Sequence, residues 1–266
     1  MMQLSEIWIY PVKSLGGIRL SEATTEERGL EYDRRWMIID ENGKFLTQRV
    51  LSKMALIDVE LTDLGLKIVN RNEPQNALIV PYLPVTQQPR TVTIWDDVVE
   101  AVTVSNEADQ WLSEQFGQKL ELVKMPEQTE RKADPRYAKN NENVSFADGF
   151  PFLIISQASL DDLNSRLEAP ITMRRFRPNI VISGTAPFEE DQWKSIQIGS
   201  LEFEIVKPCA RCILTTINPE TAEKGAEPLK TLSTFRKVNN KILFGQNAVT
   251  RTLGTMREGD SVSVLK

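Results

Sequence analysis

The chain has 266 residues, of which 41% are hydrophobic, and its formal net charge is −5. This length allows one large domain or two small ones with a substantial core, and the acidic balance argues against a broad nucleic-acid-binding face. The absence of histidine excludes Ser-His and Cys-His nucleophile pairs and imidazole zinc sites. Catalysis would have to come from cysteine, carboxylates, basic side chains or a bound cofactor.

The sequence contains no apolar run long enough to span a membrane, and its start, MMQLSEIWIYPVKS, lacks the pattern of an export signal. Two cysteines are too few for a disulfide framework in a chain of this size. We therefore expect a cytoplasmic protein without a membrane segment, whose cysteines are thiols available for metal or redox chemistry.

Short apolar runs bounded by turn residues dominate the first hundred or so residues and predict strands. The stretch RWMIIDENGKFLTQR predicts a hairpin that turns at Asp40–Gly43. Further strands are expected in ALIDVELTDLGLKIVN, ALIVPYL and TVTIWDDVVEAVTV. The first part of the chain is therefore expected to be rich in β-structure.

Two stretches have helical spacing. In SNEADQWLSEQFG, Ser105 is expected to cap a helix that stops at Gly117. A second helix is expected to begin near Ser156 in SQASLDDLNSRLE, where three leucines share one face: Leu160, Leu163 and Leu167.

The polar stretch at residues 126–143 contains little that could be buried, so we expect a linker or a mobile flap there. It predicts a domain boundary near residue 125, with domains at 1–125 and 126–266. The strand pattern returns after the second helix. Many short strands with few helices predict a mainly β (α+β) fold with barrel-like domains.

Both cysteines, Cys209 and Cys212, lie in EIVKPCARCILTTI, at the head of an expected strand. Thiolate is a soft metal ligand, but side chains three apart on a regular strand point to opposite faces. This spacing argues against a shared zinc ion or a disulfide. The alternative is that both are small buried core residues.

Basic residues recur in short stretches with strand-like flanks, and Arg and Lys suit phosphate or another oxyanion. The alternative is a set of exposed salt bridges, with Arg34 and Asp33 as the obvious pair. The residues of this set are Lys13, Arg34, Arg35, Arg174, Arg175, Arg177 and Arg211.

Asp148 precedes an apolar strand in FADGFPFLIIS. A carboxylate there could reach a site or form a hydrogen bond within its own loop as an Asx-turn.

Five motifs occur together along nearly the whole chain: YPVKS, DRRW, FRPNIVISG, C-x-R-C-I-L-T-T and LFGQN. In order and spacing they resemble the MOSC family with an N-terminal MOSC_N barrel, which includes the amidoxime-reducing components and their bacterial relatives. The resemblance implies an N-terminal MOSC_N barrel packed on a C-terminal MOSC barrel, with a site formed from both.

The resemblance also implies molybdenum cofactor (Mo-molybdopterin), in which the pterin supplies two sulfurs to the metal and the protein supplies one. The implied metal ligand is Cys212, with Asp148 near the metal, and Cys209 reverts to a packing residue. Positions implied to hold the pterin and its phosphate are Lys13, Ser14, Arg34, Arg177, Asn179, Arg211 and Gln246.

Three positions differ from residues common in the family. Gly149 and Phe150 stand where small hydroxyl residues are frequent, and Ala210 stands where a serine can occur. These differences remove side-chain hydrogen bonds to the cofactor and leave backbone N–H groups as substitutes.

The implied reaction reduces N-hydroxylated small molecules (hydroxylamines, amidoximes and N-hydroxylated bases) to amines. Because the chain has no further cysteines for an iron–sulfur cluster, electrons are expected from a separate flavin reductase, ferredoxin or cytochrome-type protein. The alternatives are a non-catalytic cofactor or sulfur carrier, with a persulfide on Cys212, and an interaction module with inert cysteines.

Overall fold

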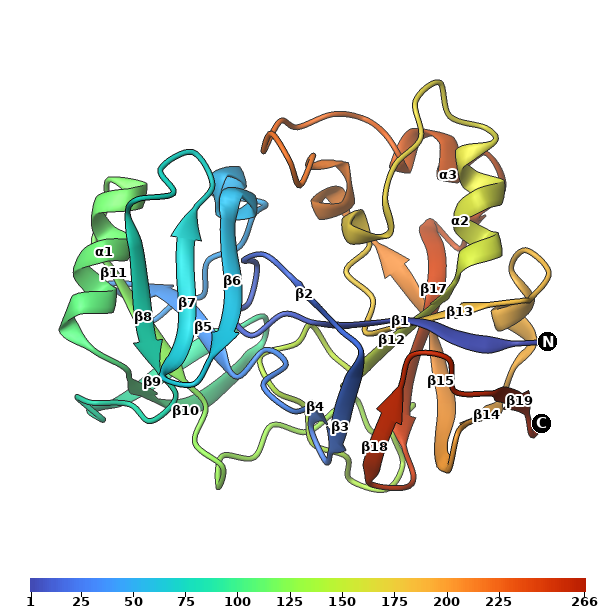
Figure 1. Cartoon of the computed structure of the whole chain (residues 1–266), viewed down its shortest axis with the longest axis horizontal. Coiled ribbons are helices and arrows are strands. Elements are labelled where there is room, and N and C mark those ends of the chain that lie inside the picture. The colour runs from blue at the N-terminus through green and yellow to red at the C-terminus, as the bar shows by residue number, and fades with distance from the viewer.

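In the computed structural model, which describes residues 1–266, the chain is mainly β with three α-helices, as the sequence predicts (Figure 1). The largest sheet has nine strands, in the order β19-β14-β15-β17-β12-β13-β1-β2, with β16 paired to β17. All its pairs are antiparallel except β12 and β13. Its strands are β1 (Gln3–Ile9), β2 (Ile18–Leu20), β12 (Phe152–Ser156), β13 (Ile180–Ser183), β14 (Ser195–Ile198), β15 (Leu201–Arg211), β16 (Lys237–Val238), β17 (Lys241–Thr250) and β19 (Val262–Val264).

Three smaller sheets complete the fold, in the orders β5-β11-β10-β9, β6-β7-β8 and β18-β3-β4. The first two form the body at the left of Figure 1, together with the first helix. Their strands are β5 (Trp36–Asp40), β6 (Ile57–Thr62), β7 (Gly65–Asn70), β8 (Ala77–Pro81), β9 (Pro89–Ile94), β10 (Asp97–Thr103) and β11 (Leu120–Lys124). The third sheet contains β3 (Glu22–Glu26), β4 (Gly29–Leu30) and β18 (Gly254–Arg257).

The helices are α1 (Asn106–Phe116), α2 (Gln157–Asn164) and α3 (Leu229–Phe235). Ser105 caps α1 by accepting a hydrogen bond from the Ala108 N–H at 3.1 Å, and Gly117 ends it with a φ of 67°. Both predicted end points of α1 are confirmed. Each could be predicted because a capping residue acts only on the few residues next to it. None of the helices is long and apolar enough to cross a membrane.

Ser156 caps α2 as predicted, and Leu160 and Leu163 are buried. Leu167 lies beyond the end of α2 but still packs against the same apolar cluster. The expected hairpin turn is also present, since the Asp40 N–H donates to the Lys44 carbonyl at 2.9 Å.

The first strands pair with strands from the second half of the chain. β1 pairs with β13, and β3 pairs with β18. The division into residues 1–125 and 126–266 stays a prediction, but main-chain hydrogen bonds cross it at both sheets. Each of these early strands therefore has one partner more than a hundred residues away and one close in sequence, β2 for β1 and β4 for β3.

The polar segment at 126–143 differs from the expected free linker. Arg131 is buried, donates to the Ser145 and Ala147 carbonyls and pairs with Asp97 at 2.7 Å. The segment is anchored by buried polar contacts, which a search for apolar residues does not detect.

Candidate functional site

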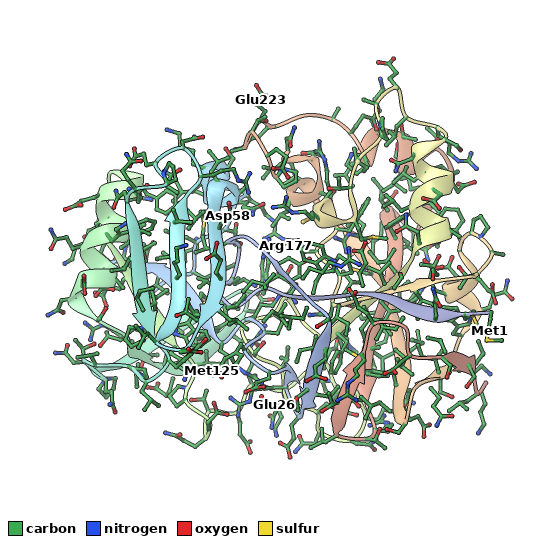
Figure 2. The ribbon with its side chains drawn as sticks, viewed as in Figure 1. Met1, Glu26, Asp58, Met125, Arg177 and Glu223 are labelled. Carbon is green, nitrogen blue, oxygen red and sulfur yellow. The ribbon has the colours of Figure 1, made fainter.

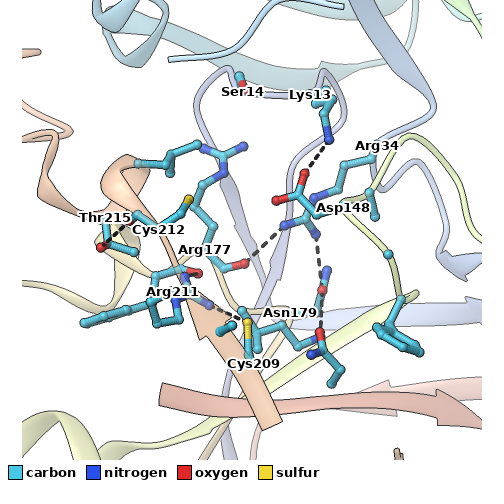
Figure 3. Close-up of a pocket in the computed structure, with 18 of the residues that line it drawn as sticks. Lys13, Ser14, Arg34, Asp148, Arg177, Asn179, Cys209, Arg211, Cys212 and Thr215 are labelled. Atoms are coloured by element: carbon cyan, nitrogen blue, oxygen red, sulfur yellow. Dashed lines mark hydrogen bonds and ion pairs between the residues drawn. The ribbon is translucent and has the colours of Figure 1, made fainter. Parts of the chain in front are cut away.

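A cavity of about 780 Å³, its open mouth included, lies where the loop after β1 meets the end of β15. Figure 3 shows basic, thiol and carboxylate side chains from distant parts of the chain pointing into it. All but one of the sequence-predicted site residues line this cavity: Lys13, Ser14, Arg34, Asp148, Arg177, Asn179, Arg211 and Cys212. The sequence could only suggest that these side chains converge, and in the structure they line one cavity.

Gln246 is the exception. Its Nε2 donates to Asp191 Oδ1 at 2.7 Å, and it does not line the cavity, whereas its neighbour Asn247 does. Successive residues of a strand face opposite sides, so an error of one position moves the side chain to the wrong face. The prediction that Gln246 lines the site is therefore wrong, and Asn247 lines the cavity in its place.

The two thiols are free, and both line the cavity. The expectation that they point to opposite sides fails because β15 is irregular between Pro208 and Ala210 and ends at Arg211. A bulge of this kind re-aims the side chains that follow it. Cys212 lies just beyond the strand, at the start of a short 3-10 helix over Ile213–Thr216.

Arg49 is the principal functional residue that sequence reasoning missed. Its Nε and Nη2 lie 3.3 and 3.0 Å from Cys212 Sγ, and its Nη2 lies 3.6 Å from Asp148 Oδ2. The guanidinium carbon sits 4.6 Å from the centre of the Trp95 ring, which holds the side chain in place. The available signal was the arginine that ends the predicted hairpin stretch, in FLTQR.

Lys13 is buried, and its Nζ contacts Asp148 Oδ1 and the Phe146 carbonyl, both at 2.7 Å. Burial disfavours the ammonium and lowers the pKa of Lys13 to about 8, although the Asp148 charge opposes this shift. Desolvation by the surrounding protein raises the pKa of Asp148. The positive charges of Lys13 and Arg49 outweigh this effect and hold that pKa well below its usual range. Asp148 is therefore a carboxylate at neutral pH, and its side chain, 64% exposed, remains open to the cavity.

Arg34 links three elements of the site. Its Nη1 contacts Asp33 Oδ2 at 2.6 Å and Asn179 Oδ1 at 3.2 Å, and its Nη2 donates to the Arg177 carbonyl at 3.1 Å (Figure 3). The salt bridge offered as an alternative role is thus present together with the site role. Asn179 in turn receives the Leu153 N–H, which ties the cavity wall to β12.

Arg177 forms no ion pair. Its guanidinium and that of Arg34 lie 4.1 and 4.3 Å from the centre of the Tyr10 ring. Burial lowers the pKa of Arg177 to about 10, and burial likewise raises the pKa of Tyr10 to about 12. The Arg177 Nη1 donates a hydrogen bond to the Leu15 carbonyl at 2.7 Å, so only part of the donor capacity of this guanidinium is used.

The backbone of the site is strained. Ser14, Arg34 and Arg177 have φ values of 70°, 51° and 54°, in the left-handed region that side chains other than glycine rarely adopt. Such conformations persist where the surrounding structure enforces them, and they cluster at functional sites.

Basic residues of the same motifs also lie outside the cavity. Arg35 is ion-paired with Glu26, and Arg174 with Glu220. The surface-pairing alternative is correct for Arg174, whereas Arg35 is buried and its ion pair is not an exposed one.

The composition of the cavity favours an anionic ligand. Five cationic side chains line it against a single carboxylate, Asp148. Three buried polar atoms of its residues or their packing partners have no hydrogen-bond partner: Tyr10 Oη, Arg49 Nη1 and Arg211 Nε. Unpaired buried donors are costly, so a site that keeps them is suited to a polar ligand.

Family models and similar proteins both match most of the length of this chain. The MOSC N-terminal beta barrel domain matches residues 1–119, and the MOSC domain matches residues 141–263. The chain is 34% identical to mitochondrial amidoxime-reducing component 1 of Mus musculus over 98% of its own length and 82% of that protein. It is 32% identical to the molybdenum cofactor sulfurase of Arabidopsis thaliana over 91% of its own length and 32% of that protein.

A crystal structure of a Bacillus subtilis protein aligns with 98% of this chain and 94% of that one, with a TM-score of 0.47 and 10% identity. The family models and the long alignment at 34% identity are decisive. The chain belongs to the MOSC family and carries its N-terminal barrel domain as well as the MOSC domain.

Proposed function

We propose that this protein is a molybdenum-cofactor-dependent reductase that converts N-hydroxylated compounds to amines, with electrons from a separate donor protein. One observation carries the proposal: the Cys212 thiol stands in a cavity lined by five cations, in a chain similar to an amidoxime-reducing component. A thiol beside a polycationic surface suits a metal that is carried by an anionic organic group.

The residues present fit such a group. The fold holds no cluster of three or more cysteine, aspartate or glutamate side chains that could bind a metal alone, so other ligands must come with the metal. The unpaired donors on Arg49 and Arg211 and the uncompensated charge of Arg177 are available to phosphate and pterin oxygens. Cys212 would be the protein ligand to molybdenum, and Lys13, Ser14, Arg34, Arg177, Asn179 and Arg211 would hold the rest.

When bound, the cofactor supplies the two-electron redox chemistry that the side chains lack. Arg49 has a positioning role, because its fork contacts Cys212 Sγ and its plane is fixed on Trp95. It also brings Asp148 to the same corner of the cavity.

Reduction of an N-hydroxyl compound consumes two electrons and two protons and releases water. Asp148 is ionised, so it accepts a hydrogen bond from the substrate nitrogen or from water and does not itself store a proton. The proton is held at Lys13 Nζ, whose pKa of about 8 suits an acid that works near neutral pH. Lys13, paired with Asp148, would pass protons from solvent to the substrate, one to the nitrogen and one to the oxygen that leaves as water.

The proposal includes a cytoplasmic location and a small redox protein as electron donor. A non-catalytic carrier of cofactor or sulfur is the second candidate, and it is supported by the similarity to a cofactor sulfurase. Molybdenum content and turnover, measured together, distinguish the reductase from the carrier.

The test is molybdenum content and turnover of an aryl amidoxime by protein made in a host that synthesises the cofactor. We expect near-stoichiometric molybdenum, which falls by at least about tenfold in Cys212→Ala together with activity. Cys209→Ala is the matched control and should keep both. Full molybdenum without reduction under any electron donor would favour the carrier, and a Cys212→Ala variant with full turnover would reject the assigned ligand.

A further inference from the structure

A second feature adjoins the cationic wall of the cavity at Phe150. Phe150 lines the cavity, and Tyr137 packs against it edge to face, with ring centres 6.3 Å apart and planes at 82°. The Lys207 ammonium lies 4.2 Å from the centre of the Tyr137 ring and 5.8 Å from that of Phe150. We call Tyr137, Phe150 and Lys207 the aromatic–lysine cluster.

The backbone directs Lys207 to this place. β15 is irregular between Ile205 and Lys207, and Lys207 lies opposite Asn247 of β17, which lines the cavity. The Asn247 Nδ2 donates to the Lys207 carbonyl at 3.2 Å, so the strand carrying Lys207 is tied to the cavity wall. A bulge re-aims the side chain that follows it, and the Lys207 ammonium lies beside the ring of Phe150.

The charge of Lys207 is not neutralised by a carboxylate. Lys207 forms no ion pair, and the nearby Asp134 is held by Arg136, with Nη2 2.6 Å from Oδ2. Ring faces attract an ammonium but leave its charge available to a further partner. Lys207 is therefore a cation without an ion-pair partner, held beside Phe150 of the cavity wall, in contrast to Arg251, which is paired with Glu142 and Glu204.

We infer that the aromatic–lysine cluster is a substrate subsite for planar aromatic compounds that carry an oxyanion, such as a carboxylate or phosphate. The ring would pack on Phe150 and the oxyanion would pair with Lys207 Nζ, while the N-hydroxyl group points inward towards Cys212. This inference rests on the proposed function and narrows its substrates to anionic aryl N-hydroxyl compounds. Phe150 is essential to it, because it supplies the ring of the cavity wall on which the substrate would pack.

The test compares a neutral aryl amidoxime with its para-carboxylate and para-phosphonate in the molybdenum-loaded protein. We expect a lower KM for the anionic compounds, and Lys207→Gln should raise that KM by about tenfold, the value of one charge-assisted contact, with kcat unchanged. The KM for the neutral compound should not change. Lys207→Arg should restore the preference, and Lys241→Gln, which removes an exposed lysine from the start of β17, is the matched control.

Binding of the corresponding non-reducible aryl amides, measured by calorimetry, separates this inference from the reductase function. Tighter binding of the charged amides that disappears in Lys207→Gln would support the subsite even without turnover. Equal affinity of the wild-type protein for charged and neutral amides would overturn it, whether or not the reductase activity is found. The carboxylate and phosphonate arms decide which oxyanion is preferred.

Discussion

The apolar core beneath α1 and the cavity around Cys212 differ in the kind of side chains that they contain and in the conformation of their backbone. Eighteen buried apolar residues form the first, and the helix over it begins and ends with standard caps. The second combines left-handed residues such as Arg34, unpaired buried polar atoms and a bulged strand. Stability is concentrated in the first region, and the capacity to bind is concentrated in the second.

The contrast indicates that the cavity lowers the stability of the folded chain. Like charges gathered around Tyr10 and Lys13, and backbone strain at Arg177, are unfavourable in the isolated chain. They persist because β1 and its neighbours are held on both sides by well-packed sheets. Substitutions in the two regions should therefore separate stability from binding.

The largest expected effect is in the core. Leu112→Ala removes a fully buried side chain of α1 and should lower the free energy of unfolding by about 3 kcal/mol. Urea unfolding measures the change, and molybdenum content per folded molecule should stay constant. Gln110→Ala, on the exposed face of the same helix, should cost less than about 0.5 kcal/mol. Loss of molybdenum from folded Leu112→Ala would show that the two regions are not separable.

The next effect concerns pH. Because burial lowers the pKa of Lys13 from 10.5 to about 8, the unfolded chain binds more protons than the folded chain between these values. The free energy of unfolding of the cofactor-free protein should therefore gain from this group as pH rises from 8 to 10. In Lys13→Met the slope against pH should fall by up to about 1.4 kcal/mol per pH unit.

Urea titrations at pH 8, 9 and 10 check this slope. Lys44→Met, at an exposed position, is the control and should leave it unchanged. Above pH 10 the raised pKa of Tyr10 acts in the opposite direction, so the comparison ends there. Equal slopes for wild type and Lys13→Met would contradict the burial argument.

The smallest effect has the opposite sign from most mutations. Arg177→Met removes a half-buried charge without an ion-pair partner, at the cost of one hydrogen bond to Leu15, and should raise the free energy of unfolding by no more than about 1 kcal/mol. The same variant should lose most of its molybdenum. Arg174→Met, which breaks an exposed pair with Glu220, should change neither quantity. A destabilised Arg177→Met would mean that the site is not built at the expense of stability.

Local signals allowed much of the fold to be predicted. Ser105, Gly117 and Ser156 each act within a few residues, and the hairpin at Asp40–Gly43 has its own turn chemistry. The MOSC motifs allowed most of the cavity lining to be named as well. These features depend on short stretches of chain, which a sequence displays directly.

The failures share one cause, which is long-range pairing. Gln246 and Asn247 differ only in register, and the facing of Cys209 and Cys212 depends on a bulge against β17. Arg49 was missed because its partners, Cys212 and Trp95, are brought to it by other elements. The anchoring of the polar segment by Arg131 was hidden for the same reason.

The pairing of β1 with β13 has a consequence for how the protein is made. As the chain leaves the ribosome, β1 and β3 emerge long before their partners β13 and β18, and until then they can pair only with their sequence neighbours β2 and β4. Lys13 and Arg34 therefore reach their final positions only after almost the whole chain has been synthesised.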